Sequence, residues 1–202
     1  MRSIKGQHGF TLIEIAIVLG ILAVLVAVLV PTLTKYVGEA KLRKAEKDVQ
    51  MICGSIGQFS SDTGLWPVSS LYGASGGTPA KNDVEVLKGP GNDPTDHTTS
   101  QWFATANTSD DLDDQLQSNV ADYPTTGSRA WQGPYLGKID KDPWGNAYLV
   151  NVEFLKPDQI KNRKSVFVLS AGPNGVIDTP YSTSTGVGIV TPQEDDVICR
   201  LK

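Results

Sequence analysis

Residues 10–30 form an apolar run of twenty-one residues in which Glu14 is the only charged side chain. A run of this length can form a helix that crosses the roughly 30 Å hydrocarbon layer of a bilayer. An ionised group inside such a helix costs roughly 2.5–3.5 kcal/mol on insertion scales, so Glu14 needs a partner. The run supplies none. We therefore expect the partner to be a new α-amino group, created on Phe10 if the chain is cut after Gly9.

The residues before this run support that cut. Arg2 and Lys5 form a short basic flank, which stays cytoplasmic and directs the C-terminal side outward. An ordinary secretory signal peptide loses its basic and apolar regions together. Here the small residue Gly9 precedes the apolar run. Cleavage would therefore remove residues 1–9 as a leader and leave residues 10–30 in the mature protein as a transmembrane helix.

A second helical pattern follows the apolar run and predicts that the helix continues over residues 31–62. Its apolar stripe consists of Leu42, Ala45, Val49, Ile52, Ile56 and Phe59, which recur at steps of three and four between charged residues. Such a stripe packs against a globular body. If the helix is continuous from Phe10 to Phe59, it is about 75 Å long. We expect a kink or local unwinding at Pro31, and an end near Gly64 and Pro67.

Residues 63–202 are about 140 residues, which is within the usual size of one domain. Within the insert 68–127, residues 68–108 are rich in turn-forming residues and predict loops, whereas residues 109–116 predict a short capped helix. The aspartates of that segment leave a metal site open as an alternative. Residues 148–152 and 166–169 predict antiparallel strands joined by the polar loop 153–165. The fold class is therefore α+β: a long N-terminal helix packed on a small C-terminal antiparallel sheet with extended loops.

Charge and residue content argue against nucleic-acid binding and against catalysis. The net charge is −4, and it becomes −6 once Arg2 and Lys5 are removed, so the subunit lacks the basic stripe that nucleic acid attracts. The two histidines are His8, in the leader, and His97, in a loop without a recognisable nucleophile. The sequence also has no phosphate loop and no zinc spacing. We expect a protein that is not an enzyme.

The N-terminal pattern matches a known family. Gly9-Phe10, followed by three residues and Glu14, resembles the prepilin signature of type IV pilins and of type II secretion pseudopilins, and Pro31 lies where that family has a proline. The resemblance implies a pilin-like fold. It also implies a membrane peptidase that cuts after Gly9 and methylates Phe10, and filament assembly that depends on Phe10, Glu14 and Pro31.

Three stretches of the globular part resemble the type II secretion major pseudopilin of the G type. They are Asp62-Thr63-Gly64-Leu65-Trp66-Pro67, Gly133-Pro134-Tyr135 and Asp142-Pro143-Trp144-Gly145. Physically, each reads as a turn anchored to the core, because Pro fixes φ, Gly permits unusual backbone angles and an aromatic residue supplies apolar surface. A ligand-binding role for Trp144 is the alternative.

The same resemblance implies a calcium ion in the C-terminal loop, residues 170–199. Carried over to this sequence, the ligands would be the Ala171 carbonyl with Asn174, Asp178, Asp195 and Asp196. Such an oxygen-rich set suits Ca²⁺. The chain departs from the family in having neutral Asn174 where Asp is common, and its loop 179–193 is longer than usual. Ordinary solvated turns remain the alternative.

Two cysteines, Cys53 and Cys199, complete the candidate residues. An exported domain meets oxidising conditions, so we predict that they pair. The bond would tie the C-terminal tail to the long helix and contribute ~4 kcal/mol in the chain-entropy model. Two buried thiols are the alternative.

The resemblance predicts a structural subunit of a periplasmic pseudopilus that drives type II protein secretion across the outer membrane. The alternative is a type IV pilin or another pilus-like surface fibre, in which the insert 68–127 would bind a surface, DNA or another protein. The implied partners are further copies of the chain, prepilin peptidase, minor pseudopilins or pilins, and an inner-membrane assembly platform. The implied location is the bacterial inner membrane, crossed once, with the C-terminal domain in the periplasm.

Overall fold

The computed structural model describes residues 10–70, 82–98, 102–103, 108–162, 164–182 and 194–201. The chain divides into two compact units, residues 1–40 and residues 41–202, and each is described by itself. The first unit carries the apolar part of a long helix. The second carries the rest of that helix and the globular part.

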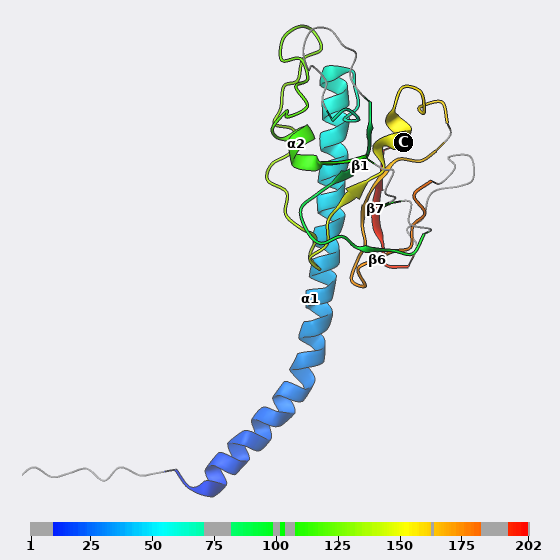
Figure 1. The fold of residues 1–202 in the computed structure, drawn as a ribbon. Coiled ribbons are helices and arrows are strands. Elements are labelled where there is room, and N and C mark those ends of the chain that lie inside the picture. The colour runs from blue at the N-terminus through cyan, green and yellow to red at the C-terminus, as the bar shows by residue number, and fades with distance from the viewer. Residues whose placement is uncertain are drawn as a thin grey trace, which may run out of the picture. The chain divides into compact units, whose positions relative to one another are not determined.

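The long helix α1 covers Leu12–Thr63, 52 residues, as the sequence predicts (Figure 1). In the second unit the apolar stripe is buried from Ala45 onward, and Val49, Ile52, Ile56 and Phe59 have almost no exposed surface. Leu42, the first residue of the stripe, is 40% exposed. The helix remains α-helical through Pro31, so the expected local unwinding does not occur.

The end of α1 lies where the turn residues predict it. The Gly64 amide donates a 2.9 Å hydrogen bond to the Ser60 carbonyl, and Gly64 adopts a φ of +67°. The Thr63 hydroxyl donates to the Phe59 carbonyl and accepts from the Leu65 amide. These bonds satisfy backbone groups that a helix end leaves without partners.

The main sheet has five strands in the order β3-β1-β4-β5-β7. Their bounds are Val84–Lys88 for β1, Thr108–Asp111 for β3, Leu149–Val150 for β4, Phe167–Ser170 for β5 and Val197–Arg200 for β7. The predicted antiparallel pair is present as β4 and β5, with Leu149 opposite Leu169. Strands β1 and β3 are parallel, so the sheet is mixed rather than wholly antiparallel.

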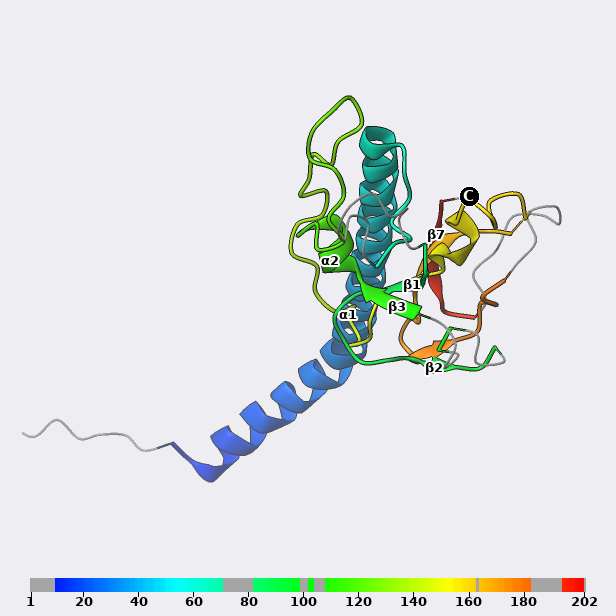
Figure 2. The same ribbon diagram turned by 45° about the horizontal axis from the view of Figure 1, so that its top comes forward.

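A second, two-stranded parallel sheet pairs β2 (Thr95–Asp96) with β6 (Val176–Ile177). Figure 2 shows these strands beside the loops at the edge of the globular part. The pairing brings a segment of the insert 68–127 against the C-terminal loop.

Three segments differ from the sequence prediction. The stretch 68–108 contains β1 and β2, and β1 is stabilised by burial of Val84, Val86 and Leu87. The capped helix expected over residues 109–116 is shorter: α2 is Leu112–Leu116, while Thr108–Asp111 pair with β1. Asp111 occupies the N-cap position without a side-chain bond. The expected loop 153–165 begins within the 3₁₀ helix η1, Val152–Leu155.

Aromatic side chains join α1 to the globular part. The Phe59 ring meets Tyr123 edge to face, with 4.8 Å between ring centroids, and meets Tyr135 at 5.6 Å. On the other side of the core, buried Trp102 packs edge to face on Phe167, and its Nε1 donates to the Thr179 carbonyl. Aromatic residues of the core therefore contact α1 and also, through Thr179, the C-terminal loop.

Candidate functional site

The first helical turn of α1 contains a reciprocal cap between Thr11 and Glu14. The backbone amide and the hydroxyl of Thr11 each donate a 2.8 Å hydrogen bond to Glu14 Oε2, and the Glu14 amide donates to the Thr11 hydroxyl at 3.3 Å. Thr-x-x-Glu is the capping-box signature, and sequence reasoning missed it although the pattern was visible. These bonds are to neutral groups, so they leave the carboxylate charge uncompensated. Gly9 lies outside the described residues, and Phe10 is 84% exposed.

The apolar part of α1 is uncovered. Its large side chains from Leu12 to Val30 are between 46% and 93% exposed within the chain. Among the described residues, α1 is the one helix long and apolar enough to cross a membrane, although a signal sequence near an N-terminus would meet the same criteria. Something outside this chain must cover such a surface.

The Asp-Pro-Trp-Gly turn is built around buried Asp142. Asp142 Oδ1 accepts hydrogen bonds from the amides of Trp144 and Asn146, at 3.0 and 2.7 Å. Asp142 Oδ2 accepts from the Ser170 hydroxyl at 2.8 Å. Gly145 adopts a φ of +103°, which favours glycine. The turn is thus tied to the residue where the C-terminal loop begins.

The Gly-Pro-Tyr turn is tied to α1 instead. The bond between Gly133 and Pro134 is cis, and the Ser55 hydroxyl of α1 donates a 2.9 Å hydrogen bond to the Tyr135 carbonyl. Together with the ring contact to Phe59, this agrees with a structural interpretation of the motif.

The five predicted calcium ligands lie on two segments that are hydrogen-bonded to each other. Asp195 Oδ2 accepts from the Asn174 amide at 3.0 Å. Asp196 Oδ2 accepts from the amides of Asp178 and Thr179, at 3.0 and 2.7 Å. Ala171, on the same segment as Asn174 and Asp178, is fully buried. A Cβ on the next residue, Gly172, would overlap the Asp195 carbonyl, so the two segments approach closely.

Two carboxylate oxygens in this loop are buried without hydrogen-bond partners, Asp195 Oδ1 and Asp196 Oδ1. Burial raises the pKa of Asp196, although the bonds from Thr179 and Asp178 oppose that shift. These two oxygens fit a cation. The described residues nevertheless contain no group of three or more acidic, histidine or cysteine side chains placed to hold a metal, either here or among the aspartates of 109–116. His97, which sequence reasoning did not connect with this loop, has its Nδ1 3.8 Å from Asp178 Oδ1.

Cys53 of α1 and Cys199 of β7 form a disulfide, with 6.4 Å between their Cα atoms. Strand β7 is the edge strand of the sheet and pairs with β5 over four residues. The disulfide therefore adds a covalent attachment of the C-terminal strand to α1, immediately after Asp195 and Asp196.

Two family models match the chain. Residues 4–30 match the prokaryotic N-terminal methylation motif, and residues 107–182 match protein G of the type II secretion system. Type II secretion system core protein G of Klebsiella pneumoniae is 25% identical over 172 residues, covering 85% of this chain and 89% of the relative. That of Escherichia coli (strain K12) is 25% identical over 179 residues, covering 89% and 90%. These matches support a type II secretion major pseudopilin.

The matches confirm the resemblance that the motifs predict. The methylation motif covers Gly9, Phe10 and Glu14, and the protein G model covers both anchored turns. The protein G model ends before Asp195 and Cys199, so it does not bear on the last ligands or on the disulfide. Fimbrial protein EcpC of Eikenella corrodens is 34% identical over 64 residues, which is 32% of this chain and 42% of that protein. No solved structure gives a significant match.

Proposed function

We propose that this pseudopilin is the structural subunit of a periplasmic pseudopilus, polymerised through α1, that drives type II secretion across the outer membrane. The observation that carries the proposal is the uncovered apolar half of α1, joined to a folded globular part. Lipid would cover this helix before assembly, and the helices of other copies would cover it in the filament.

Maturation would precede assembly. A prepilin peptidase would cut after Gly9 and methylate the new N-terminal Phe10, which the matched methylation motif supports. The chain would then cross the bacterial inner membrane once, with residues from about 35 onward in the periplasm. Its partners would be copies of itself, minor pseudopilins and an inner-membrane assembly platform.

Within the filament, Glu14 would pair with the Phe10 ammonium of a neighbouring copy. Both groups are charged, and the apolar surroundings of a filament core would penalise either one alone. The bonds from Thr11 hold the carboxylate in place but supply no positive charge.

A Ca²⁺ ion is proposed for the C-terminal loop, held by Asp195 and Asp196 with Asn174, Asp178 and the Ala171 carbonyl. The two unpartnered carboxylate oxygens support this assignment. When bound, the ion would supply the positive charge that these buried oxygens lack. The chain's own hydrogen bonds to Asp195 and Asp196 would hold both carboxylates for it.

The second candidate function is a type IV pilin or another surface fibre, which the partial match to a fimbrial protein favours. Deletion of the gene in its native bacterium separates the two. Loss of protein release across the outer membrane with surface fibres intact is the result expected for a pseudopilin. Loss of surface fibres with secretion intact would overturn the proposal in favour of a pilin.

A further inference from the structure

The C-terminal loop contains the pair Asn174-Gly175, the one Asn-Gly pair in the sequence. The other seven asparagines each precede a residue with a side chain. The backbone nitrogen that follows an asparagine can attack its side-chain carbonyl carbon, and glycine has no side chain to hinder that approach. Asn174 is exposed and Gly175 is half-buried, so water reaches the pair. The pair therefore meets the chemical requirements for deamidation, which replaces a neutral amide by a carboxylate.

The turn around this pair favours the attack. The Val176 amide donates a 2.6 Å hydrogen bond to Asn174 Oδ1. This bond closes a ring of atoms that includes Asn174 Cγ and the Gly175 nitrogen, so both reacting atoms lie within one tight turn. It also places a donor on the oxygen that becomes negative when the nitrogen adds to Cγ. The Gly175 amide itself makes only a long bond, 3.3 Å, to the Gly172 carbonyl.

The reaction needs water and no other reagent. The Gly175 nitrogen loses its proton to water, and its electron pair forms a bond to Asn174 Cγ. The bond from Cγ to the side-chain nitrogen breaks, and that nitrogen takes up a proton and leaves as ammonia. Water then adds to Cγ of the five-membered ring, the bond from Cγ to the Gly175 nitrogen breaks, and that nitrogen regains a proton. One water is consumed, one ammonia is released, and an aspartate stands at position 174.

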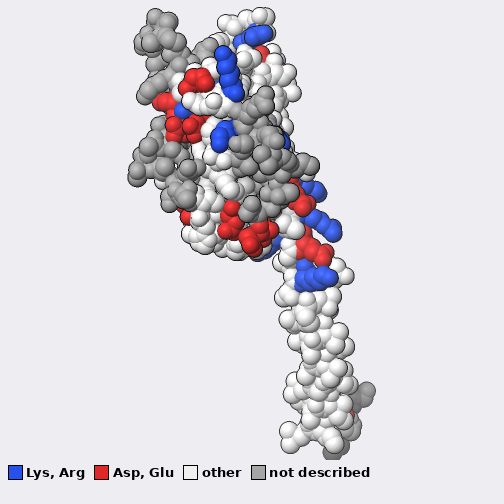
Figure 3. Space-filling view, turned by 90° about the vertical axis from the view of Figure 1, so that its right-hand side faces the viewer, with Lys and Arg blue, Asp and Glu red and all other residues white. Residues whose placement is uncertain are grey.

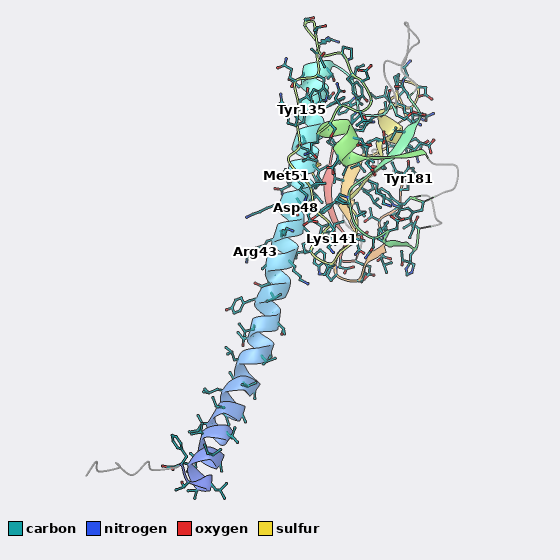
Figure 4. The ribbon with its side chains drawn as sticks, turned by 60° about the vertical axis from the view of Figure 1, so that its left-hand side comes forward. Arg43, Asp48, Met51, Tyr135, Lys141 and Tyr181 are labelled. Carbon is teal, nitrogen blue, oxygen red and sulfur yellow. A yellow bond between two sulfur atoms is a disulfide. The ribbon has the colours of Figure 1, made fainter. Side chains whose placement is uncertain are left out.

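Main-chain bonds on both sides of the pair favour this product. Opening the ring at its other carbonyl would insert Cβ into the backbone and lengthen it. The Asn174 amide donates to Asp195 Oδ2 at 3.0 Å, and the Gly175 carbonyl accepts from the Thr95 amide at 2.9 Å. Farther along, Tyr181 packs edge to face on a core tryptophan, and Figure 4 labels it within the globular part. A longer backbone would disrupt the two bonds next to the pair, so the fold retains ordinary aspartate.

The new carboxylate would join a loop that already lacks positive charge. Asp195 Oδ1 and Asp196 Oδ1 are buried without hydrogen-bond partners, and Asp196 is only 4% exposed. Position 174 is bonded to Asp195 through its backbone amide. Figure 3 shows acidic side chains gathered at the lower end of the globular part, where β6 lies in Figure 1. A further charged oxygen ligand increases the affinity of such a loop for a divalent cation.

We propose that Asn174 is a self-modification site: attack by the Gly175 nitrogen converts it to aspartate, and the new carboxylate strengthens cation binding by Asp195 and Asp196. The effect on the cation rests on the proposed calcium site, whereas the deamidation does not. Newly made protein then carries the weaker form of the loop, and the affinity of the loop for calcium increases as the protein ages.

Mass spectrometry tests the modification. The full-length chain in detergent is incubated, and peptides from successive samples are compared with those of the starting sample. The peptide that contains Asn174 should become heavier by about one dalton, because OH replaces NH₂. In isotopically labelled water it should also take up one labelled oxygen. Asn92, which is exposed and precedes Asp93, is the internal control and should not change.

A variant supplies the matched control for the attack. Asn174→Gln keeps a neutral amide but would need a larger ring, so its peptide should keep its mass. The proposal is overturned if the wild-type peptide keeps its mass, or if Asn92 and Asn174 change equally fast.

Calorimetric titration with calcium chloride tests the effect on the cation. Asn174→Asp, which has the product's side chain, should have a dissociation constant about tenfold lower than the freshly purified wild type. The aged wild type should approach the value of this variant, while Asn174→Gln should not change on ageing. Equal affinities of Asn174→Asp and the fresh wild type would reject the effect on the cation alone. Absence of binding by both would overturn the calcium site together with this effect, and the mass measurements would still decide the deamidation.

Discussion

The Tyr148 hydroxyl donates a 2.8 Å hydrogen bond to the Asp48 carboxylate, joining the residue before β4 to α1. Tyr148 is fully buried, and Asp48 keeps some exposure beside Lys44. Burial and, to a smaller extent, the bond to Asp48 raise the pKa of Tyr148 well above its ordinary value, so the hydroxyl is protonated and donates at neutral pH. This contact fixes the globular part on the helix at the point where the apolar stripe becomes buried.

Replacing Tyr148 by Phe keeps the packing and removes this bond. Because the acceptor is charged but partly solvated, the free energy of unfolding should fall by about 1–2 kcal/mol. Urea unfolding of the full chain in detergent measures the change. Tyr36→Phe, at a residue that is 64% exposed, is the control and should change little. Equal effects of the two substitutions would show that the bond to Asp48 contributes nothing.

The two roles of Glu14 can be separated by Glu14→Gln. The amide oxygen of Gln can still accept the bonds from Thr11, but it has no charge to offer the ammonium of a neighbouring Phe10. We expect normal insertion and cleavage with little filament in the sheared fraction. Thr11→Val, which loses the hydroxyl but keeps the carboxylate, should assemble better than Glu14→Gln. Wild-type assembly by Glu14→Gln would reject the charge pairing and leave helix capping as the role of Glu14.

Gly9→Val tests processing. A β-branched residue at the cleavage position should prevent the peptidase from cutting, so a precursor longer by nine residues should accumulate in the membrane. Gel mobility and mass spectrometry report the product. Efficient cleavage of this variant would remove the role assigned to Gly9.

Calcium and pH should act on Asp196 in opposite directions. Burial raises the folded-state pKa of Asp196 above the ordinary value of 3.8, so the protonated carboxyl favours folding. In chelator, the stability of the wild type relative to Asp196→Asn should therefore be highest at low pH. It should decline as the pH rises from 3.8 through the raised folded-state pKa.

With calcium at neutral pH, the wild type should be more stable than Asp196→Asn, which reverses the order of stability expected in chelator. Binding to the folded state alone contributes about 2.7 kcal/mol at a hundredfold excess over the dissociation constant, and the Asn variant should lose most of this. Thermal melts of both proteins in chelator measure the pH dependence, and melts in calcium measure the stabilisation by the ion. If calcium leaves the wild-type melting curve unchanged, the loop holds no stabilising cation.

Reduction should loosen the C-terminal strand. The disulfide between Cys53 and Cys199 spans 146 residues, and closing a loop of that size is worth about 4–5 kcal/mol in the chain-entropy model. Cys53→Ser combined with Cys199→Ser should lower the denaturant midpoint and abolish its response to reductant. If reductant leaves the denaturant midpoint of the wild type unchanged, the stability of the protein does not depend on this bond.

The sequence predicted the elements whose apolar residues repeat regularly. It missed the strands that depend on pairing with segments far away in the sequence. The stripe from Ala45 to Phe59 repeats over four turns, so α1 could be read directly. Strand β1 could not, because Val84–Lys88 is short, lies among turn residues and gains its stability from pairing with β3 and β4. The aspartates at 110 and 111 suggested a helix cap, yet they pair with β1.

In the candidate site, too, the relationships between residues close in sequence could be predicted, and those that depend on tertiary packing could not. Gly9, Phe10 and Glu14 are close in sequence, so their relationship was visible. The bond from Ser170 to Asp142, 28 residues away, and the approach of His97 to Asp178 depend on tertiary packing and left no local signal. The Thr11 cap was local and could have been found from its spacing alone.

The most direct test of the account is the mass of the subunit in filaments isolated from the native bacterium. Maturation and polymerisation together predict a chain that begins at Phe10 and carries one added methyl group on it. An unmethylated chain that retains residues 1–9 in those filaments would contradict the account.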